Sequence, residues 1–274
     1  MTADHGALRS KPAGNTGSLL ILIDVGNTNA VFGVYRGDQL VKSLRLATTG
    51  KRTADEYLAL LLPLFSSAGL DPAEVHDVVI SSVVPPLHGT LTDMSRRLFG
   101  VEPVFIDSHT DTGLPVRYDN PAEVGADRIV NALAARELHG APVVVVDFGT
   151  ATTFDVVNAA GEYVGGLITP GISISAEALF SNASRLYRVD IRQPEHLVGT
   201  DTAGAMQSGI YYGYIGLVDG IMERLKAEMP GIKKVIATGG LAELIASGSR
   251  HIDEVDQLLT LTGLKLIHER LHRR

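Results

Sequence analysis

The sequence predicts an α/β protein built from two similar halves with a ligand cleft between them. One observation is an internal repeat: LLILIDVGNTNAVFGVYRGDQL, which begins at Leu19, resembles PVVVVDFGTATTFDVVNAAGEY, which begins at Pro142. In both copies an apolar strand ends in Asp-x-Gly, a short polar turn follows, and a second apolar strand completes the unit. A second observation is that similar elements follow both copies in similar order. Two like halves of this kind favour one ligand held between them.

Each copy of the repeat is expected to form a β-hairpin with a carboxylate at its tip. The runs rich in Val and Ile are typical of buried strands, and turns that combine Asp or Asn with Gly are typical of hairpins. Alignment of the two copies pairs Asp24 with Asp147 and Gly26 with Gly149.

Hydrophobic periodicity predicts the remaining elements. In the first half we expect strands over residues 40–47, 77–83 and 104–106, and helices over residues 53–67 and 86–99. In the second half we expect strands over residues 163–168 and 234–237, helices over residues 172–179, 202–228 and 241–246, and a turn at Gly239-Gly240. The predicted domains are residues 19–122 and 123–274, after a flexible leader of residues 1–18 that is rich in small and polar residues.

Composition excludes several classes of function. The formal net charge is -7, so the chain lacks the basic field that would hold a nucleic acid or an anionic membrane. The longest uncharged helical stretch, residues 202–218, contains tyrosines and glycines and is shorter than the ~20 apolar residues that a bilayer requires. The absence of cysteine excludes disulfides and thiolate chemistry and fits a cytoplasmic location.

The hairpin tips have the composition of a phosphate site. Glycines at 26 and 149 allow close backbone approach to phosphate oxygens, and the neighbouring Asn27, Thr28, Asn29, Thr150 and Thr152 can add hydrogen-bond donors. A carboxylate at such a tip is compatible with phosphate only if a cation lies between them, as Mg²⁺ does. Asp24 and Asp147 are therefore candidate cation ligands, and the alternative is that both only form Asx turns. The chain has no Walker A or GxGxxG motif.

A candidate catalytic base lies between the halves, in VRYDNPAEVGADRIVNALAA (residues 116–135). Helical spacing after Asp127 places this residue at or near a helix N-terminus. In one interpretation Asp127 is an N-cap and Arg128 is solvated. In the other, Asp127 faces the cleft and accepts a proton from a substrate hydroxyl, while Arg128 holds an anionic group of the substrate.

The motif set resembles that of type III pantothenate kinases, a family of the acetate and sugar kinase, Hsp70 and actin superfamily. The resemblance covers the chain from about Leu19 to Ala246. It is carried by five motifs in order: Asp24-x-Gly-Asn-Thr-Asn29, Tyr118-x-Asn-Pro-x-x-x-Gly-Ala-Asp127-Arg128, Asp147-x-Gly-Thr-Ala151, Gly165-Gly-x-Ile-x-Pro-Gly171 and Ala205-Met-Gln-Ser-Gly209.

The resemblance implies two actin/Hsp70-like, ribonuclease H-like domains and a kinase that converts pantothenate to 4'-phosphopantothenate with ATP, Mg²⁺ and K⁺ or NH₄⁺. The ATP-binding residues that it implies are Asp24, Val25, Gly26, Asn27, Thr28, Asn29, Ala30, Val31 and Thr150. It also implies that Asp24 lies near Mg²⁺ and contacts it through water, and that Asp147 is the monovalent-cation ligand. It implies that Asp127 is the catalytic proton acceptor. It also implies that the pantothenate contacts are Tyr118, Gly125, Ala126, Asp127, Arg128 and Thr202. Where family members often carry Gly-x-Asn-Thr, this chain has Gly199-Thr200-Asp201-Thr202, so Thr200 is the alternative to Thr202.

Several other features have two interpretations. His268 and His272 could bind a metal, although a basic helix end formed with Arg270, Arg273 and Arg274 is favoured. The glycines at 204, 209, 213, 216 and 220 predict either a homodimer contact or a close contact within the chain. The competing functions are a kinase for another small molecule, a polyphosphate phosphatase, and a nucleotide-dependent binding or regulatory protein.

Overall fold

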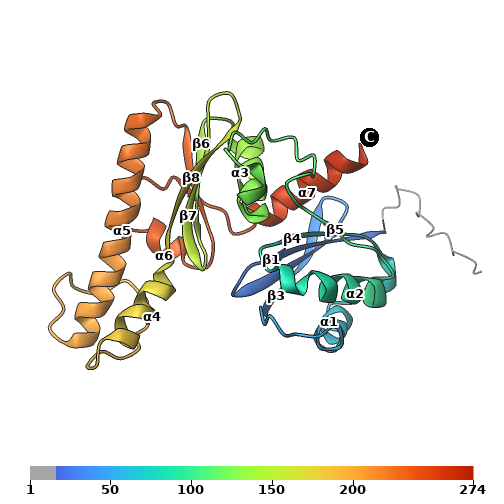
Figure 1. Ribbon diagram of the computed structural model, residues 1–274. Coiled ribbons are helices and arrows are strands. Elements are labelled where there is room, and N and C mark those ends of the chain that lie inside the picture. Colours follow the sequence, from blue (N-terminus) through green and yellow to red (C-terminus); the bar gives the residue numbers. More distant parts are fainter. Residues whose placement is uncertain (1–16, 274) are drawn as a thin grey trace, which may run out of the picture.

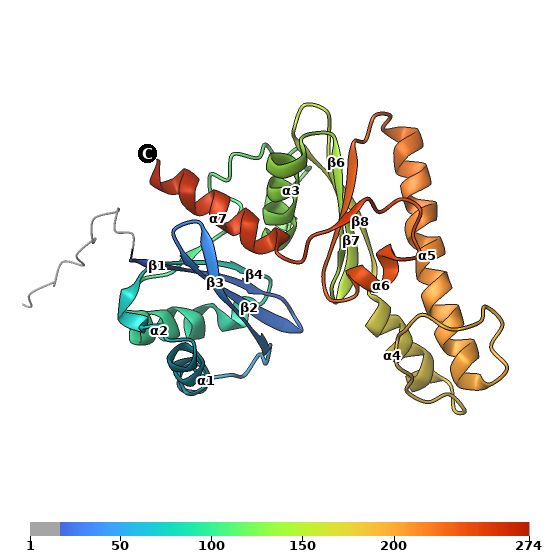
Figure 2. The same cartoon turned by 180° about the vertical axis from the view of Figure 1, so that it is seen from behind.

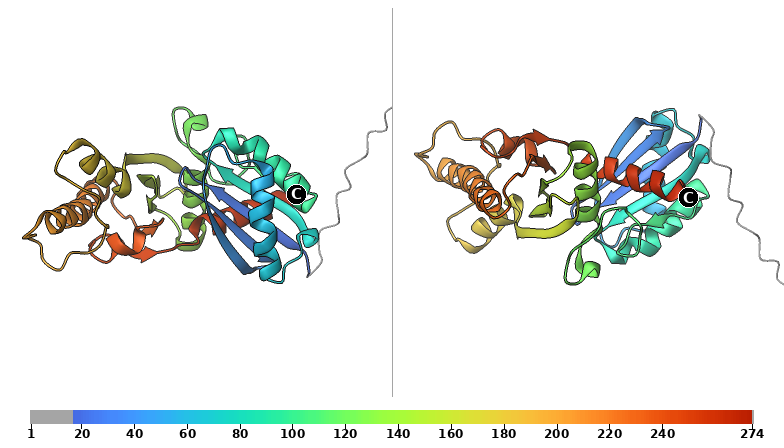
Figure 3. Two further views of the ribbon diagram at one scale, coloured as in Figure 1. Left: turned by 90° about the horizontal axis from the view of Figure 1, so that it is seen from below. Right: turned by 90° about the horizontal axis from the view of Figure 1, so that it is seen from above.

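The structure is a computed structural model that describes residues 17–273, so the predicted leader lies almost entirely outside the described residues. Figure 1 shows two sheets, each covered by helices, with further helices between them. Both sheets have five strands. In Figure 3, seen from below and from above, the two sheets lie at different ends of an elongated molecule. The two-part α/β architecture expected from the repeat is therefore confirmed.

The first sheet has the strand order β3-β2-β1-β4-β5. Its strands are β1 (Leu19–Val25), β2 (Asn29–Arg36), β3 (Gln39–Ala47), β4 (Val75–Ser82) and β5 (Val104–Phe105). Strand β2 pairs antiparallel with both β1 and β3, whereas β4 pairs parallel with β1 and β5 pairs parallel with β4. Helices α1 (Ala54–Ser67) and α2 (His88–Phe99) lie side by side on one face of this sheet (Figure 1).

The second sheet repeats this topology with the order β10-β9-β6-β7-β8. Its strands are β6 (Val143–Phe148), β7 (Ala151–Val157), β8 (Tyr163–Pro170), β9 (Lys234–Thr238) and β10 (Glu254–Val255). Helices α4 (Ile172–Asn182), α5 (Thr202–Glu228) and α6 (Ala242–Ala246) cover its outer face, away from the first sheet (Figure 1). Position by position, β6 to β10 therefore match β1 to β5.

Two helices, α3 (Ala126–His139) and α7 (Leu259–His272), lie between the sheets, as Figure 2 also shows. One apolar cluster joins Leu22 and Val79 of the first sheet to Leu133 of α3, Val145 of the second sheet and Leu264 of α7. Helix α7 contacts both α3 and the strands β1 and β4. The last helix of the chain thus packs against the first half of the protein.

Most predicted elements are present with small shifts at their ends. Helix α1 begins after Thr53, whose side chain accepts a hydrogen bond from the Glu56 amide while the Glu56 carboxylate accepts one from the Thr53 amide. The helix expected over residues 86–99 begins with a 3₁₀ turn, Pro85–Leu87, because prolines at 85 and 86 supply no amide donors. Strand β10 and the full length of α7 were not predicted. In the described residues no helix is long and apolar enough to cross a membrane.

Candidate active site

The two hairpin tips meet. The Thr28 and Thr150 hydroxyl groups, 122 positions apart in the sequence, are hydrogen-bonded at 2.9 Å. The first tip is closed by a bond from the Gly26 amide to the Asn29 carbonyl at 3.0 Å. The Thr48 hydroxyl, just after β3, donates to the Gly26 carbonyl at 2.7 Å and secures this turn. The expectation that both tips face one cleft is therefore confirmed.

Only some side chains of the first hairpin segment are accessible to a ligand. Asn27, Thr28 and Asn29 are exposed at the tip, whereas Val25 and Ala30 are buried in the core under the first sheet. The segment can therefore offer polar side chains at the turn, while its flanking residues can offer only backbone groups. Such a division is expected of a loop that holds phosphate oxygens with amide N–H groups.

The three candidate carboxylates converge beside these tips. Burial, followed by the negative charges of Asp127 and Asp147, raises the pKa of Asp24 to about 8, and the hydroxyl of buried Ser81 opposes the rise. Burial, followed by the charges of Asp127 and Asp155, raises the pKa of Asp147 to about 7. A cluster of this kind resists full ionisation at neutral pH, and a cation bound among the oxygens would offset the repulsion.

The surroundings of Asp147 come from three different elements. The side-chain amide of Asn131 in α3 donates a hydrogen bond to the Asp147 carboxylate at 3.2 Å. The hydroxyl of Thr260 in α7 donates to the side-chain oxygen of Asn131, Oδ1, at 2.7 Å. Gly239, directly after β9, has a φ of +94°, and a Cβ there would lie 2.6 Å from Asp147 Oδ1. Residue 239 must therefore be glycine for two reasons: the backbone has a positive φ, and a side chain would collide with Asp147.

Asp127 lies in the first turn of α3, two residues after the N-cap, Gly125. Because Gly125 occupies the cap, the interpretation of Asp127 as an N-cap residue is wrong. The Arg128 amide donates to Asp127 Oδ1 at 2.8 Å, and a Cβ at residue 125 would lie 2.5 Å from that same oxygen. Burial raises the pKa of Asp127, while the Arg128 amide and then the Arg128 charge oppose this. A carboxyl group with a raised pKa is suited to accept a proton.

Arg128 is buried, so the prediction that it is solvated is also wrong. Its Nε donates to Asp155 Oδ1 at 2.6 Å, and Asp155 accepts further bonds from Thr153 and from Tyr163. Arg128 and Asp155 thus form a buried ion pair within the protein. The guanidinium also has a buried nitrogen, Nη2, that has no hydrogen-bond partner among the described residues.

Arg128 Nη2 is next to the glycine pair of β8. A Cβ at Gly166 would lie 3.1 Å from this nitrogen, and a Cβ at Gly165 would lie 3.2 Å from the Tyr118 ring. Tyr118 is partly exposed, with its ring centroid 6.4 Å from that of Tyr163. The expected substrate residues Tyr118 and Arg128 therefore border the same strand. At Gly166 the missing side chain lets β8 pack directly on the Phe154 carbonyl oxygen, which a Cβ would approach to 1.7 Å.

Thr202 is in a different environment. It begins α5, where Asp201 is the N-cap, and it lines an apolar groove of about 720 Å³ between α4 and α5. None of the described residues that line this groove belongs to the acidic cluster. The single chain therefore does not bring Thr202 together with Asp127.

Sequence reasoning missed three polar residues of the site. Asn131 follows Asp127 by one helical turn, so both lie on one face of α3. That spacing could have indicated that Asn131 belongs to the same site as Asp127. Asp155 is a charged residue inside the apolar run of β7, which is a signal of a buried partner. Ser81 carries no sequence signal, because it approaches Asp24 only through the parallel pairing of β1 with β4.

The chain matches proteins of one family over most of its length. The sequence model for type III pantothenate kinase matches residues 20–224. A type III pantothenate kinase of Myxococcus xanthus is 56% identical over 254 residues, covering 93% of this chain and 99% of the relative. Another from Koribacter versatilis is 52% identical, covering 92% and 96%.

Solved structures agree on the fold. A Baf family protein of Campylobacter jejuni superposes with a TM-score of 0.59 at 23% identity, covering 93% of this chain and all of the other. Component A of the Acidaminococcus fermentans (R)-2-hydroxyglutaryl-CoA dehydratase superposes with a TM-score of 0.54 at 13% identity, covering 93% and 99%. These likenesses concern architecture, whereas the sequence matches above are close and nearly complete. The chain belongs to the type III pantothenate kinase family.

Proposed function

We propose that this protein is a pantothenate kinase, which transfers the γ-phosphoryl group of ATP to the primary hydroxyl of pantothenate and so forms 4'-phosphopantothenate for coenzyme A synthesis. The observation that carries the proposal is the convergence of Asp24, Asp127 and Asp147 beside the joined tips at Thr28 and Thr150. Family membership supplies the acceptor, because the relatives at more than 50% identity are named for it.

Asp127 is assigned as the proton acceptor. The substrate hydroxyl oxygen forms a bond to the γ-phosphorus while the bond from phosphorus to the ADP oxygen breaks, and the hydroxyl proton passes to the Asp127 carboxylate. The short bond from the Arg128 amide supports this role because it fixes the orientation of the carboxyl group. The exposed tip residues Asn27, Thr28, Asn29 and Thr150 are assigned to the ATP phosphates.

The donor set at the tips fits cations. Asp24 and Asp147 supply the carboxylate oxygens that these cations prefer. Burial and then neighbouring negative charges raise the pKa of each, and bound positive charge would offset both effects. Asp24 is assigned to Mg²⁺ through water, and Asp147 to K⁺ or NH₄⁺. A bound Mg²⁺ would neutralise charge on the phosphate oxygens.

Arg128 Nη2 is assigned to an anionic group of the substrate, the carboxylate of pantothenate. Its burial without a partner supports this, because an unpaired buried donor is costly unless a ligand completes it. Tyr118, Gly125 and Ala126 are assigned to the same substrate. We assign Thr202 as a further pantothenate contact, with Thr200 as its alternative.

A homodimer is proposed through α5. A Cβ added at Gly209, Gly213 or Gly216 would meet nothing within 4 Å, so these glycines serve no close contact within the chain. Their spacing of four and three residues places them on one face of α5, next to the apolar groove. A second copy on this face would account for all three. A cytoplasmic location is proposed from the cysteine-free composition.

The test is ADP release by the purified protein with ATP and Mg²⁺, with and without pantothenate, and with Na⁺ in place of K⁺. We expect release only with pantothenate, a phosphorylated product of the corresponding mass, and a fall when K⁺ is withdrawn. Release without pantothenate would indicate another acceptor or a phosphohydrolase. Nucleotide binding without release would indicate a regulatory protein.

A further inference from the structure

A cluster of metal-binding side chains lies outside the proposed active site. It joins Asp77 of β4 to His268 and His272 of α7, and one ligand atom from each lies within 4.8 Å of the others. We propose that these three residues form a binding site for Zn²⁺ that links the C-terminal helix to the first sheet.

The distances fit tetrahedral coordination. His268 Nε2 lies 3.1 Å and His272 Nε2 lies 3.7 Å from the same oxygen, Asp77 Oδ2. Zinc bonds of about 2.0–2.1 Å place neighbouring ligand atoms roughly 3.3–3.4 Å apart. Only small side-chain movements are therefore needed to surround one ion with these three atoms, which leaves the fourth position to water.

The tautomer of His272 also fits a ligand. Its Nδ1 lies 2.9 Å from the His268 carbonyl oxygen, which can only accept, so Nδ1 carries the proton. In the neutral ring Nε2 then has a free lone pair on the side of Asp77. A bond from the second ring nitrogen to a backbone carbonyl is the usual support of a metal-bound histidine.

The two elements hold the ligands in place independently of any ion. Histidines four residues apart lie on one face of a helix, and the ring centroids are 4.2 Å apart. Asp77 lies in the pairing register of β1 and β4, opposite Leu20. His268 is 16% exposed and His272 is 44% exposed, so the cluster is supported by packing on one side and open to solvent on the other.

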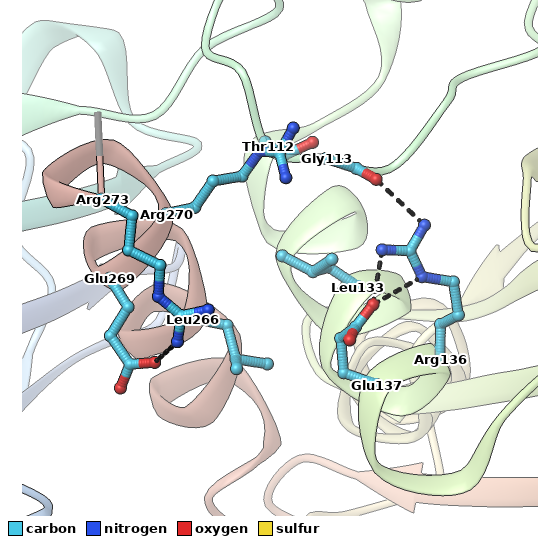
Figure 4. Close-up of a pocket in the computed structure, with 9 residues that line it drawn as sticks. All are labelled: Thr112, Gly113, Leu133, Arg136, Glu137, Leu266, Glu269, Arg270 and Arg273. Carbon is cyan, nitrogen blue, oxygen red and sulfur yellow. Dashed lines mark hydrogen bonds and ion pairs between the residues drawn. The ribbon is translucent and has the colours of Figure 1, made fainter.

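The cationic side chains of α7 do not oppose a metal ion, because each has an acidic partner. Lys265 pairs with Asp38 and Glu269, and Arg270 pairs with Asp111. Arg273 pairs with Glu269 at 3.3 Å, which Figure 4 shows beside the hollow between α3 and α7. The described part of the basic helix end expected from the sequence is thus largely neutralised, and Arg274 lies outside the described residues.

Zinc binding to the metal-free, full-length protein tests the proposal. The titration is made in competition with a chromophoric chelator and in excess Mg²⁺, which occupies sites made of oxygens alone. We expect one Zn²⁺ per chain in the wild type. Asp77→Asn, His268→Gln and His272→Gln should each weaken binding at least about tenfold. His196→Gln, at an exposed position between α4 and α5, and Asp24→Asn should bind as the wild type does.

A thermal melt supplies a second readout. An ion that binds only the folded protein raises its melting temperature, so Zn²⁺ should raise that of the wild type and not that of His272→Gln. Since His272 is substantially exposed, its replacement leaves the core filled and the variant folded. A folded wild type that binds no Zn²⁺, or His272→Gln and Asp77→Asn variants that bind it unchanged, would overturn the proposal in favour of an ion pair alone.

Discussion

The two halves of the molecule share a sheet topology and a hairpin carboxylate, but they surround that carboxylate differently. Asp24 is approached within its own half by Ser81 of β4, whereas Asp147 is held by Asn131 of the intervening helix α3. The same helix carries Asp127. In the mechanism proposed above, the repeated sheet provides two similar tips for nucleotide and cations, and α3 adds the base to one side. On that proposal the repeat supplies binding and helix α3 supplies the chemistry.

The sharpest test of this division is Asp127→Asn. Loss of a positioned base lowers kcat by ~10²–10⁴-fold, and the fold should remain intact because the amide can still accept from the Arg128 N–H. The assay is pantothenate-dependent ADP release. Asp119→Asn, an exposed position before the same helix, is the control and should retain full activity. Wild-type turnover in Asp127→Asn would show that the base lies elsewhere.

The next largest effect should be on stability, in the second half. Asp155→Asn leaves Arg128 buried without its counter-charge, a change that costs about 3–5 kcal/mol in the free energy of unfolding. The matching change in the first half is Asp93→Asn, which breaks a solvent-exposed pair with Arg97 and should leave the free energy of unfolding almost unchanged. Urea denaturation of both variants measures the difference. Equal losses would mean that the buried pair has no special weight.

The tip carboxylates should make stability depend on pH when no cation is bound. Because the pKa of Asp24 is raised from 3.8 to about 8, its contribution is fully present below pH 3.8 and is lost as pH rises towards 8. Asp24→Asn should therefore melt at higher temperature than the wild type at pH 8, by roughly 2–4 °C for each kcal/mol, but not at pH 4.

Asp147→Asn should also raise the melting temperature at high pH but not at pH 4. Because the pKa of Asp147 is raised to about 7, the gain should reach its full size once the pH passes 7. Melts are recorded in EDTA and Na⁺. A pH-independent difference between wild type and variants would indicate that the acids are already neutralised within the protein.

The smallest effect concerns the contact between the tips. Thr28→Val and Thr150→Val remove the two hydroxyls of one hydrogen bond. In a double-mutant cycle based on free energies of unfolding, their coupling energy should be about 0.5–1 kcal/mol. Thr49→Val, an exposed threonine beyond the first hairpin, should show no coupling with Thr150→Val. Zero coupling for Thr28 would mean that the tips are held together without this bond.

The parts of the fold that local patterns govern could be predicted from the sequence. The strands around Asp24 and Asp147 are continuous apolar runs that end in turn residues, and Thr53 with Glu56 marks the start of α1. Strand β10 could not be predicted because two residues carry no periodicity. The placement of α7 depends on contacts with β1, which lies more than 200 residues earlier in the sequence.

The site shows the same limit. Asp127 could be found because helix geometry and family motifs both indicate it. Its neighbours in space could not, since the buried bond between Arg128 and Asp155 joins a helix to a strand of the adjoining sheet. Local spacing also gave no means of deciding whether Arg128 is solvated, because its exposure depends on how Tyr163 and β7 pack around it.

The position of α7 has a consequence for synthesis. Its fourteen residues end at His272, and they cover apolar side chains of β1 and β4 that belong to the first part of the chain to be made. That surface stays open until residues 259–272 have left the ribosome, and the support that Thr260 gives to Asn131 forms only then. Nascent chains truncated before residue 259 should therefore expose an apolar sheet face, and a fusion that pulls α7 away from the sheet should expose the same face.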